Sequence, residues 1–169
     1  MTVSIVKANF PERAGSKGIS GKEFLAYLNY GENATEQSPV WNLLGGTDSD
    51  TLGISAEVST KQTKDSGFWQ EGAVSGKSGE YSAEMTVLTD SVAQAAIEEF
   101  IYNDEVTTEK RALHMALVNN VTKDYKEFWI IPTSWELSAE SGDLATYSFS
   151  GTLVGTPVRK SNFSVAAGD

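Results

Sequence analysis

The chain has 169 residues, enough for one domain with a sizeable hydrophobic core. It has no cysteine, which excludes disulfides, thiol nucleophiles and thiolate metal sites. Its formal net charge of −10 argues against tight binding of nucleic acid, because affinity for phosphates depends on Lys and Arg. We expect no secretion signal and no membrane span, because neither a signal-type apolar stretch nor a run of about 20 apolar residues occurs.

The first 22 residues predict an arm outside the core. They contain Pro11 and several glycines and show little periodicity. Residues 23–30 then predict a strand, residues 31–39 a polar loop, and residues 40–44 a short apolar strand. We expect residues 23–158 to form a single β domain.

Two strands with strict alternation follow. Leu52, Ile54, Ala56 and Val58 share one face of the first, and Tyr81, Ala83, Met85 and Val87 share one face of the second. Residues 61–80 between them predict a long polar loop. A connection longer than about 12–15 residues is uncommon unless it is disordered or has a function. Phe68 and Trp69 within it suggest an arm that becomes ordered against another molecule, most simply another copy of this chain.

Residues 91–103 predict the one convincing helix. Ser91 has the position of an N-cap, with Gln94 at the spacing of a capping box. Ala93, Ile97 and their neighbours form an apolar stripe, while Gln94 falls on the opposite face. We expect the helix to cover the sheet.

Three further strands complete the domain, over residues 111–118, 125–137 and 145–153. The first two are apolar on both faces, which indicates burial on both sides and, in a domain of this size, often a subunit interface. Residues 159–169 predict a loosely held tail. About seven strands and one helix favour an antiparallel β-sandwich or barrel.

No catalytic, cofactor or metal site is predicted. Residues 76–78 lack the glycine spacing of a phosphate loop, and residues 48–53 depart from a calcium loop. His114, the only histidine, lies among apolar neighbours and is interpreted as structural. We expect no enzymatic activity. Trp41, Trp69, Trp129 and Trp135 leave open a carbohydrate- or ligand-binding module as an alternative function.

Several segments resemble the major tail proteins of tailed bacteriophages, the subunits of the tail tube. They are residues 52–61, then Lys64-Asp65, Trp69, Glu71 and Gly76-Lys77-Ser78, and finally residues 142–153. The resemblance covers about residues 20–158 and consists of strands, turns and spacings. It implies a barrel-like β-sandwich with a flanking helix.

The resemblance also implies a function. Six copies would form a ring, and stacked rings would form the conduit through which DNA is ejected without specific binding. The implied partners are further copies, tape-measure, tail-terminator and baseplate proteins. The implied location is the virion tail, assembled in the cytoplasm of the host bacterium. Whether the tail is contractile stays open, and so does whether the free protein is monomeric.

Particular residues receive roles from this interpretation. Phe68 and Trp69, with Lys64 and Asp65, are candidates for an assembly loop. Glu57 and Glu84 are candidates for the lumen wall, because a DNA conduit should repel phosphate and both lie on polar strand faces. The N-terminal arm is expected to bridge stacked rings.

Overall fold

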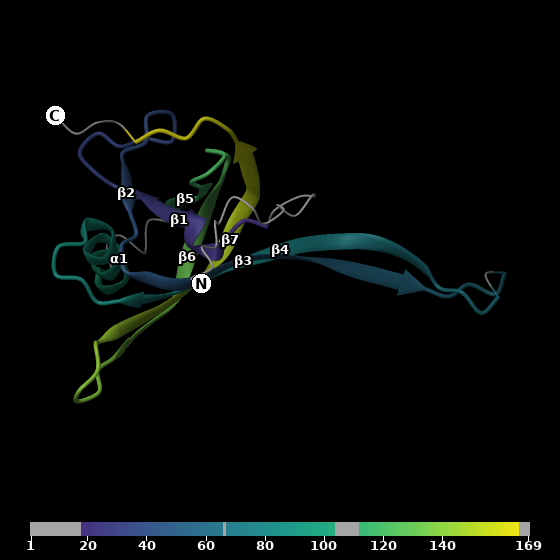
Figure 1. Cartoon of the computed structure of the whole chain (residues 1–169). Helices are drawn as coiled ribbons and strands as arrows, with labels where there is room; N and C mark the ends of the chain where they lie inside the picture. The colour runs from purple at the N-terminus through teal and green to yellow at the C-terminus, as the bar shows by residue number, and fades with distance from the viewer. Residues whose placement is uncertain (1–17, 66, 104–111, 166–169) are drawn as a thin grey trace, which may run out of the picture.

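The computed structural model describes residues 18–65, 67–103 and 112–165 (Figure 1). Within them lie seven strands, one α-helix and a short 3-10 turn, η2 (Gly21–Glu23). The α-helix is α1 (Val92–Tyr102). The strands are β1 (Phe24–Asn29), β2 (Trp41–Leu43), β3 (Thr47–Lys61), β4 (Glu71–Thr86), β5 (Leu113–Asn119), β6 (Tyr125–Ser138) and β7 (Thr146–Lys160). No helix in these ranges is long and apolar enough to span a membrane. The predicted N-terminal arm lies largely outside the described residues.

All seven strands belong to one antiparallel sheet in the order β2-β1-β5-β6-β7-β4-β3. β2 and β3 are its two edges, yet only residues 44–46 separate them in the chain. A link this short spans at most about 14 Å, so the edges must approach each other and the sheet must curl. Leu44 donates its N–H to Ala26 O of β1, and Gly46 O accepts from Thr86 N–H of β4. The fold class predicted from the sequence is confirmed.

Gly46 is required at this crossover. Its φ is +72°, and an added Cβ would lie 2.6 Å from the carbonyl oxygen of Thr86. Both the conformation and the close approach favour glycine. The two sheet edges therefore meet through a turn that other residues would strain.

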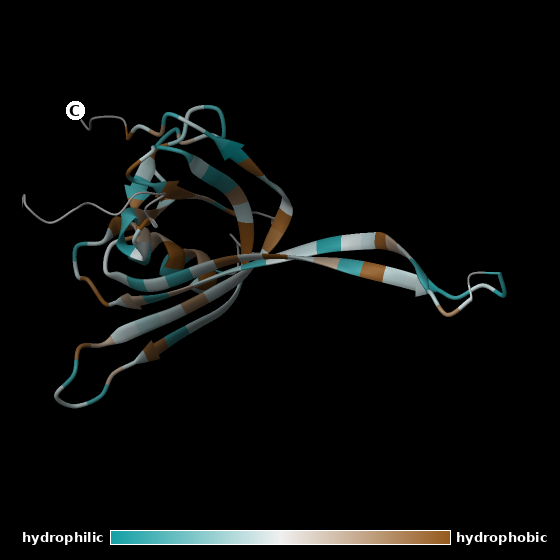
Figure 2. Cartoon of the chain, turned by 45° about the vertical axis from the view of Figure 1, so that its right-hand side comes forward, coloured by the Kyte–Doolittle hydropathy of each residue, from teal (hydrophilic) through white to brown (hydrophobic). Residues whose placement is uncertain are grey.

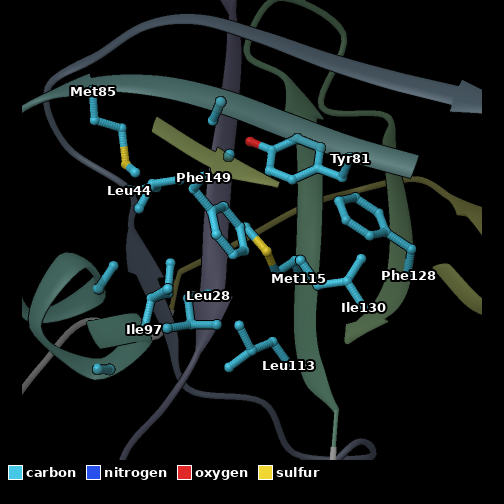
Figure 3. Close-up of a cluster of buried hydrophobic side chains, with 14 residues drawn as sticks. Leu28, Leu44, Tyr81, Met85, Ile97, Leu113, Met115, Phe128, Ile130 and Phe149 are labelled. Atoms are coloured by element: carbon cyan, nitrogen blue, oxygen red, sulfur yellow. The ribbon is translucent and has the colours of Figure 1, made fainter. Parts of the chain in front are cut away.

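The curled sheet encloses a single main core, to which five strands and the helix contribute (Figure 3). The largest fully buried side chains include Tyr81, Phe149, Leu28, Met85, Ile97, Met115 and Ile130. Tyr81 donates its hydroxyl to Asp50 Oδ2 at 3.2 Å. Burial, reinforced by this carboxylate, raises the pKa of Tyr81 well above its usual value. The inward face predicted for Tyr81, Ala83, Met85 and Val87 is confirmed for the first three, whereas Val87 lies beyond the end of β4 and is half-buried.

The predicted helix is present and capped as expected, since Ser91 Oγ accepts from the N–H of Gln94. The prediction of a solvent-facing Gln94 is wrong, because its side chain is buried. Gln94 accepts from Leu88 N–H and donates to the carbonyl oxygens of Gly45 and Thr86, all at 2.9 Å. Backbone groups at the crossover need partners, and the amide supplies them.

Two predicted boundaries are wrong. Residues 71–80, taken as part of a loop, form the first ten residues of β4, and only residues 62–70 connect it to β3. The segment pairs with β3 along its whole length, and Gly72, Gly76 and Gly79 had made it look like a loop. At the other end β7 continues to Lys160 because it pairs with β6. Beyond it, Phe163 packs on Tyr27 and Tyr125, so the predicted loose tail is held there.

Candidate assembly surfaces

The most exposed element is the outer part of the β3–β4 hairpin, which extends far from the body (Figures 1 and 2). β4 pairs with β7 only through residues 80–86, so residues 71–79 pair with β3 alone. We call residues 54–79 the arm. Two-stranded ribbons are marginally stable in water without a covering layer. The arm therefore has the form of a segment that another molecule covers.

One face of the arm is mostly apolar, with Lys77 on it opposite Ala56. The alternation predicted for residues 52–59 is present, but Ile54 and Val58 are each 59% exposed instead of buried. Val74 lies opposite Val58 in the register and is equally open. Ser55 and Ser78 occupy the other face, with their hydroxyl oxygens 3.1 Å apart. An apolar ribbon face outside the body is a candidate contact surface.

The tip of the arm holds two aromatic side chains. Phe68 and Trp69 are exposed by 102% and 84%. Lys64 and Asp65, the other predicted assembly residues, lie in the same turn and are also exposed. A hydrogen bond with Thr63 is the main cause of the lowered pKa of the Asp65 carboxyl. The four residues predicted as an assembly loop thus share one projecting tip.

The two glutamates predicted for the lumen lie in different places. Both are exposed and on polar strand faces, but Glu57 belongs to the arm, opposite Gly76. Glu84 belongs to the body, opposite Ser49 on β3 and Ser148 on β7. Glu84 lies opposite Ser49, eight positions before Glu57 on β3, and eight positions correspond to about 26 Å along the strand. The two glutamates therefore do not form one cluster.

Glu84 belongs to a polar surface that the sequence pattern does not predict. This serine face lies outside the curled sheet, across β4, β7 and β6, and borders a shallow depression of about 350 Å³. It consists of Ser82, Glu84, Ser134, Glu136, Ser148 and Ser150. Hydroxyls bridge its strands, as between Ser134 and Ser150. The strand register alone brings Glu136 into line with Glu84, so the sequence pattern could not reveal this pairing.

His114 is held in a buried polar network. Asn29 accepts from Val40 N–H through Oδ1, so its Nδ2 must donate to His114 Nδ1, 2.9 Å away. The neutral ring then carries its proton on Nε2, which lies 2.9 Å from Oε1 of Glu127. Lys160 lies 2.7 Å from the other carboxylate oxygen of Glu127. In the described residues no group of three His, Cys, Asp or Glu side chains is arranged to hold a metal ion.

The pKa of Glu127 reflects opposing effects. Burial of the carboxyl acts to raise the pKa, but the contacts with Lys160 and His114 outweigh it and the pKa is lowered. Lys160 comes from β7, whereas His114 and Asn29 come from β5 and β1. The network thus joins four strands of the sheet, as expected of a structural histidine.

The four tryptophans do not form a common platform. Trp41 is buried beside His114, and Trp129 stacks on His114 with ring centroids 4.4 Å apart. Trp135 packs on Tyr147, also at 4.4 Å. Trp69 stands alone at the arm tip. A carbohydrate site built from these rings therefore has no geometric support.

Comparison with known proteins decides the family. A family model described as "Phage tail tube protein" matches residues 19–159, which is most of the chain and all seven strands except the last residue of β7. The chain belongs to the phage tail tube protein family. The resemblance seen in the sequence is confirmed. A search of curated proteins finds no significant sequence match.

Solved structures share the fold of this tail tube family member. The tail of an empty gene transfer agent particle, refined helically with C6 symmetry, has a TM-score of 0.68 and 14% identity, covering 85% of this chain and 100% of that chain. The SPP1 tail tube has a TM-score of 0.69 and 13% identity, covering 88% and 82%. The sheath-tube complex of an extracellular contractile injection system has a TM-score of 0.56 and 13% identity, covering 86% and 93%. At these identities the likeness concerns the fold.

Proposed function

We propose that this protein is the structural subunit of a bacteriophage tail tube, built from stacked hexameric rings that conduct DNA during ejection. The observation that carries the proposal is the arm, a two-stranded ribbon with an exposed apolar face and an aromatic tip. Family membership supports the same function. The sixfold symmetry is carried over from the gene transfer agent tail, whose subunit has this fold. The role is structural, with no reaction catalysed.

The arm is the proposed assembly element. Phe68 and Trp69, flanked by Lys64 and Asp65, dock on a neighbouring subunit or ring and lose their exposure there. Apolar surface removed from water favours association at roughly 25 cal/mol per Å². Each ring of six subunits would repeat the contact six times, so a modest contribution per subunit accumulates along the tube.

The lumen wall is proposed to include the serine face with Glu84. Its six residues carry two carboxylates and no basic group. A wall without Lys or Arg has nothing to displace counterions from DNA, so the polymer passes without being retained. Glu57, on the polar side of the arm, is the second proposed lumen residue.

Other components follow from this function. The tube would contact a tape-measure protein inside and a terminator and baseplate at its ends. Baseplate and sheath contacts are supported by solved structures with this fold that come from the baseplate of the anti-feeding prophage and from a sheath-tube complex. The protein would reside in the virion tail after assembly in the host cytoplasm.

Electron microscopy of the purified protein tests the proposal. We expect rings or tubes with sixfold symmetry in negative stain, forming above a critical protein concentration. A protein that stays monomeric at all concentrations and binds an oligosaccharide as a monomer would contradict the proposed tube function.

A further inference from the structure

Charge is distributed unevenly over the body. The described basic residues outside the arm are Lys22, Lys123, Lys126, Arg159 and Lys160. All except Lys22 belong to the β5–β6 turn, the start of β6 and the end of β7. Asp124 and Glu127 are the acidic residues of that same region, so four basic residues stand against two acidic ones. In a chain with a net charge of −10, this end is unusual in being basic.

The basic end contains a groove of about 700 Å³. We call it the basic groove. Its lining includes apolar Phe24, Leu117 and Tyr125, basic Lys126, Arg159 and Lys160, and acidic Asp124. Lys160 is paired with Glu127, so Lys126 and Arg159 supply the unpaired positive charge of the lining. Lys126 and Arg159 are direct partners in the β6–β7 register, so their side chains leave the same side of the sheet. The groove therefore offers apolar surface beside positive charge.

The opposite end of the same strand pair has the complementary character. The β6–β7 hairpin, residues 136–146, carries Glu136, Glu140 and Asp143, and no basic residue. Leu137 and Leu144 in it are exposed by 60% and 77%. The hairpin thus joins exposed leucines with the carboxylates of Glu140 and Asp143 in its turn, while Glu136 at its base also belongs to the serine face.

A chain cannot place its own hairpin in its own groove. β7 runs from the hairpin to the groove, and its 15 residues correspond to about 45 Å. Figure 1 shows the hairpin at the lower left and the end of β7 at the top. The two surfaces can meet only between different molecules.

We propose that the acidic β6–β7 hairpin of one copy docks in the basic groove of a second copy. The proposal rests on the proposed tube function and names a contact within it. Such a contact is heterologous, since each copy gives its hairpin to one neighbour and its groove to another. Contacts of this kind close into a ring or propagate in a fixed direction, and a tube of stacked rings contains both kinds of contact.

The arm tip is a poorer occupant of the groove. Residues 61–71 carry Lys61, Lys64, Asp65 and Glu71, so the tip has no net charge to match a basic surface. Charge complementarity favours correct encounters and rejects like-charged surfaces. The hairpin supplies that complementarity together with apolar side chains.

Charge reversal tests the contact. We expect Glu140→Lys with Asp143→Lys, or Lys126→Glu with Arg159→Glu, to raise the critical concentration for assembly roughly tenfold or more. All four side chains are exposed, so the monomer should keep its fold. The control matched to Glu140→Lys with Asp143→Lys is Asp90→Lys with Glu99→Lys, which makes the same change of charge on exposed positions near α1 and should assemble normally.

Restoring assembly by combining the charge reversals is the decisive part of the experiment. A chain with all four reversals restores opposite charges across the contact and should assemble near the wild-type concentration, and so should a mixture of the two double variants. Failure of both rescues, or normal assembly of each double variant, overturns the contact but leaves the tube function standing. Wild-type protein that forms neither rings nor tubes would instead remove the proposed function itself.

Crosslinking identifies the occupant directly, because the natural chain has no cysteine. Leu144→Cys mixed with Thr122→Cys, which lies in the groove lining, should give an oxidised dimer in the assembled state. Phe68→Cys mixed with Thr122→Cys should not. If Phe68→Cys forms the crosslink with Thr122→Cys and Leu144→Cys does not, the arm tip occupies the groove and the proposal is overturned.

Discussion

Replacing Trp69 with alanine should weaken assembly without affecting the folded monomer. The side chain is 84% exposed at the arm tip and contributes nothing to the core, so its loss leaves the melting temperature unchanged. Burying a large apolar side chain contributes roughly 1.5–3 kcal/mol. Since about 1.4 kcal/mol corresponds to a factor of ten, the critical concentration for assembly should rise roughly 10- to 100-fold.

The assay is sedimentation of tubes across a series of protein concentrations, with thermal unfolding measured on the same samples. Tyr102→Ala is the matched control, because Tyr102 is a 73% exposed aromatic residue at the end of α1, away from the arm. It should leave the critical concentration near the wild-type value. Normal polymerisation of Trp69→Ala would refute the reasoning, because the arm tip would then not be a contact.

Three other predictions concern the arm root, the buried network and the lumen. Gly79→Ala should destabilise the protein by about 1–3 kcal/mol in chemical denaturation, because the new Cβ would lie 2.9 Å from Leu153 Cδ2 and 3.0 Å from Gly53 O, whereas Gly53→Ala meets nothing within 4 Å and should be tolerated. Glu127→Gln should lose roughly 1–3 kcal/mol of stability at neutral pH. The pKa of Glu127 is lowered in the folded state, so its charged form stabilises the fold above the unfolded pKa of about 4.5 and loses this effect as the pH falls through the folded value; the difference from wild type should therefore shrink in acid unfolding curves. Glu57→Lys with Glu84→Lys should still assemble but slow genome release in an infection assay, and a failure to assemble would place these residues in a subunit contact.

The body of the fold could be predicted well because its signals are local. Alternation over residues 81–85 and the capping spacing at Ser91 reflect contacts made within one strand or one helical turn. Gln94 could not be predicted in the same way. Its partners at Gly45 and Thr86 come from other elements, and helical spacing contains no information about them.

The structure of the arm, by contrast, could not be predicted from local sequence signals. Residues 71–79 have little strand propensity and three glycines, and they form a strand because β3 lies beside them over its whole length. The exposure of Ile54 was equally hidden, since alternation indicates that side chains share a face but not that the face has a partner within the chain. The serine face likewise depends on the register of β4, β7 and β6, which the sequence pattern does not contain.

The two projecting hairpins carry some of the most exposed apolar residues of the chain, among them Phe68, Trp69 and Leu144. The core is closed within the described body, so assembly need not disturb it. The arm and the β6–β7 hairpin can each contact another molecule without disturbing the body, because the strands that carry them stay paired within the sheet. Their contributions to tube stability should therefore be separable: Trp69→Ala combined with Glu140→Lys and Asp143→Lys should raise the critical concentration by about the product of the separate effects, as expected for independent sites. A combined effect much smaller than the product would mean that both hairpins contribute to one shared contact.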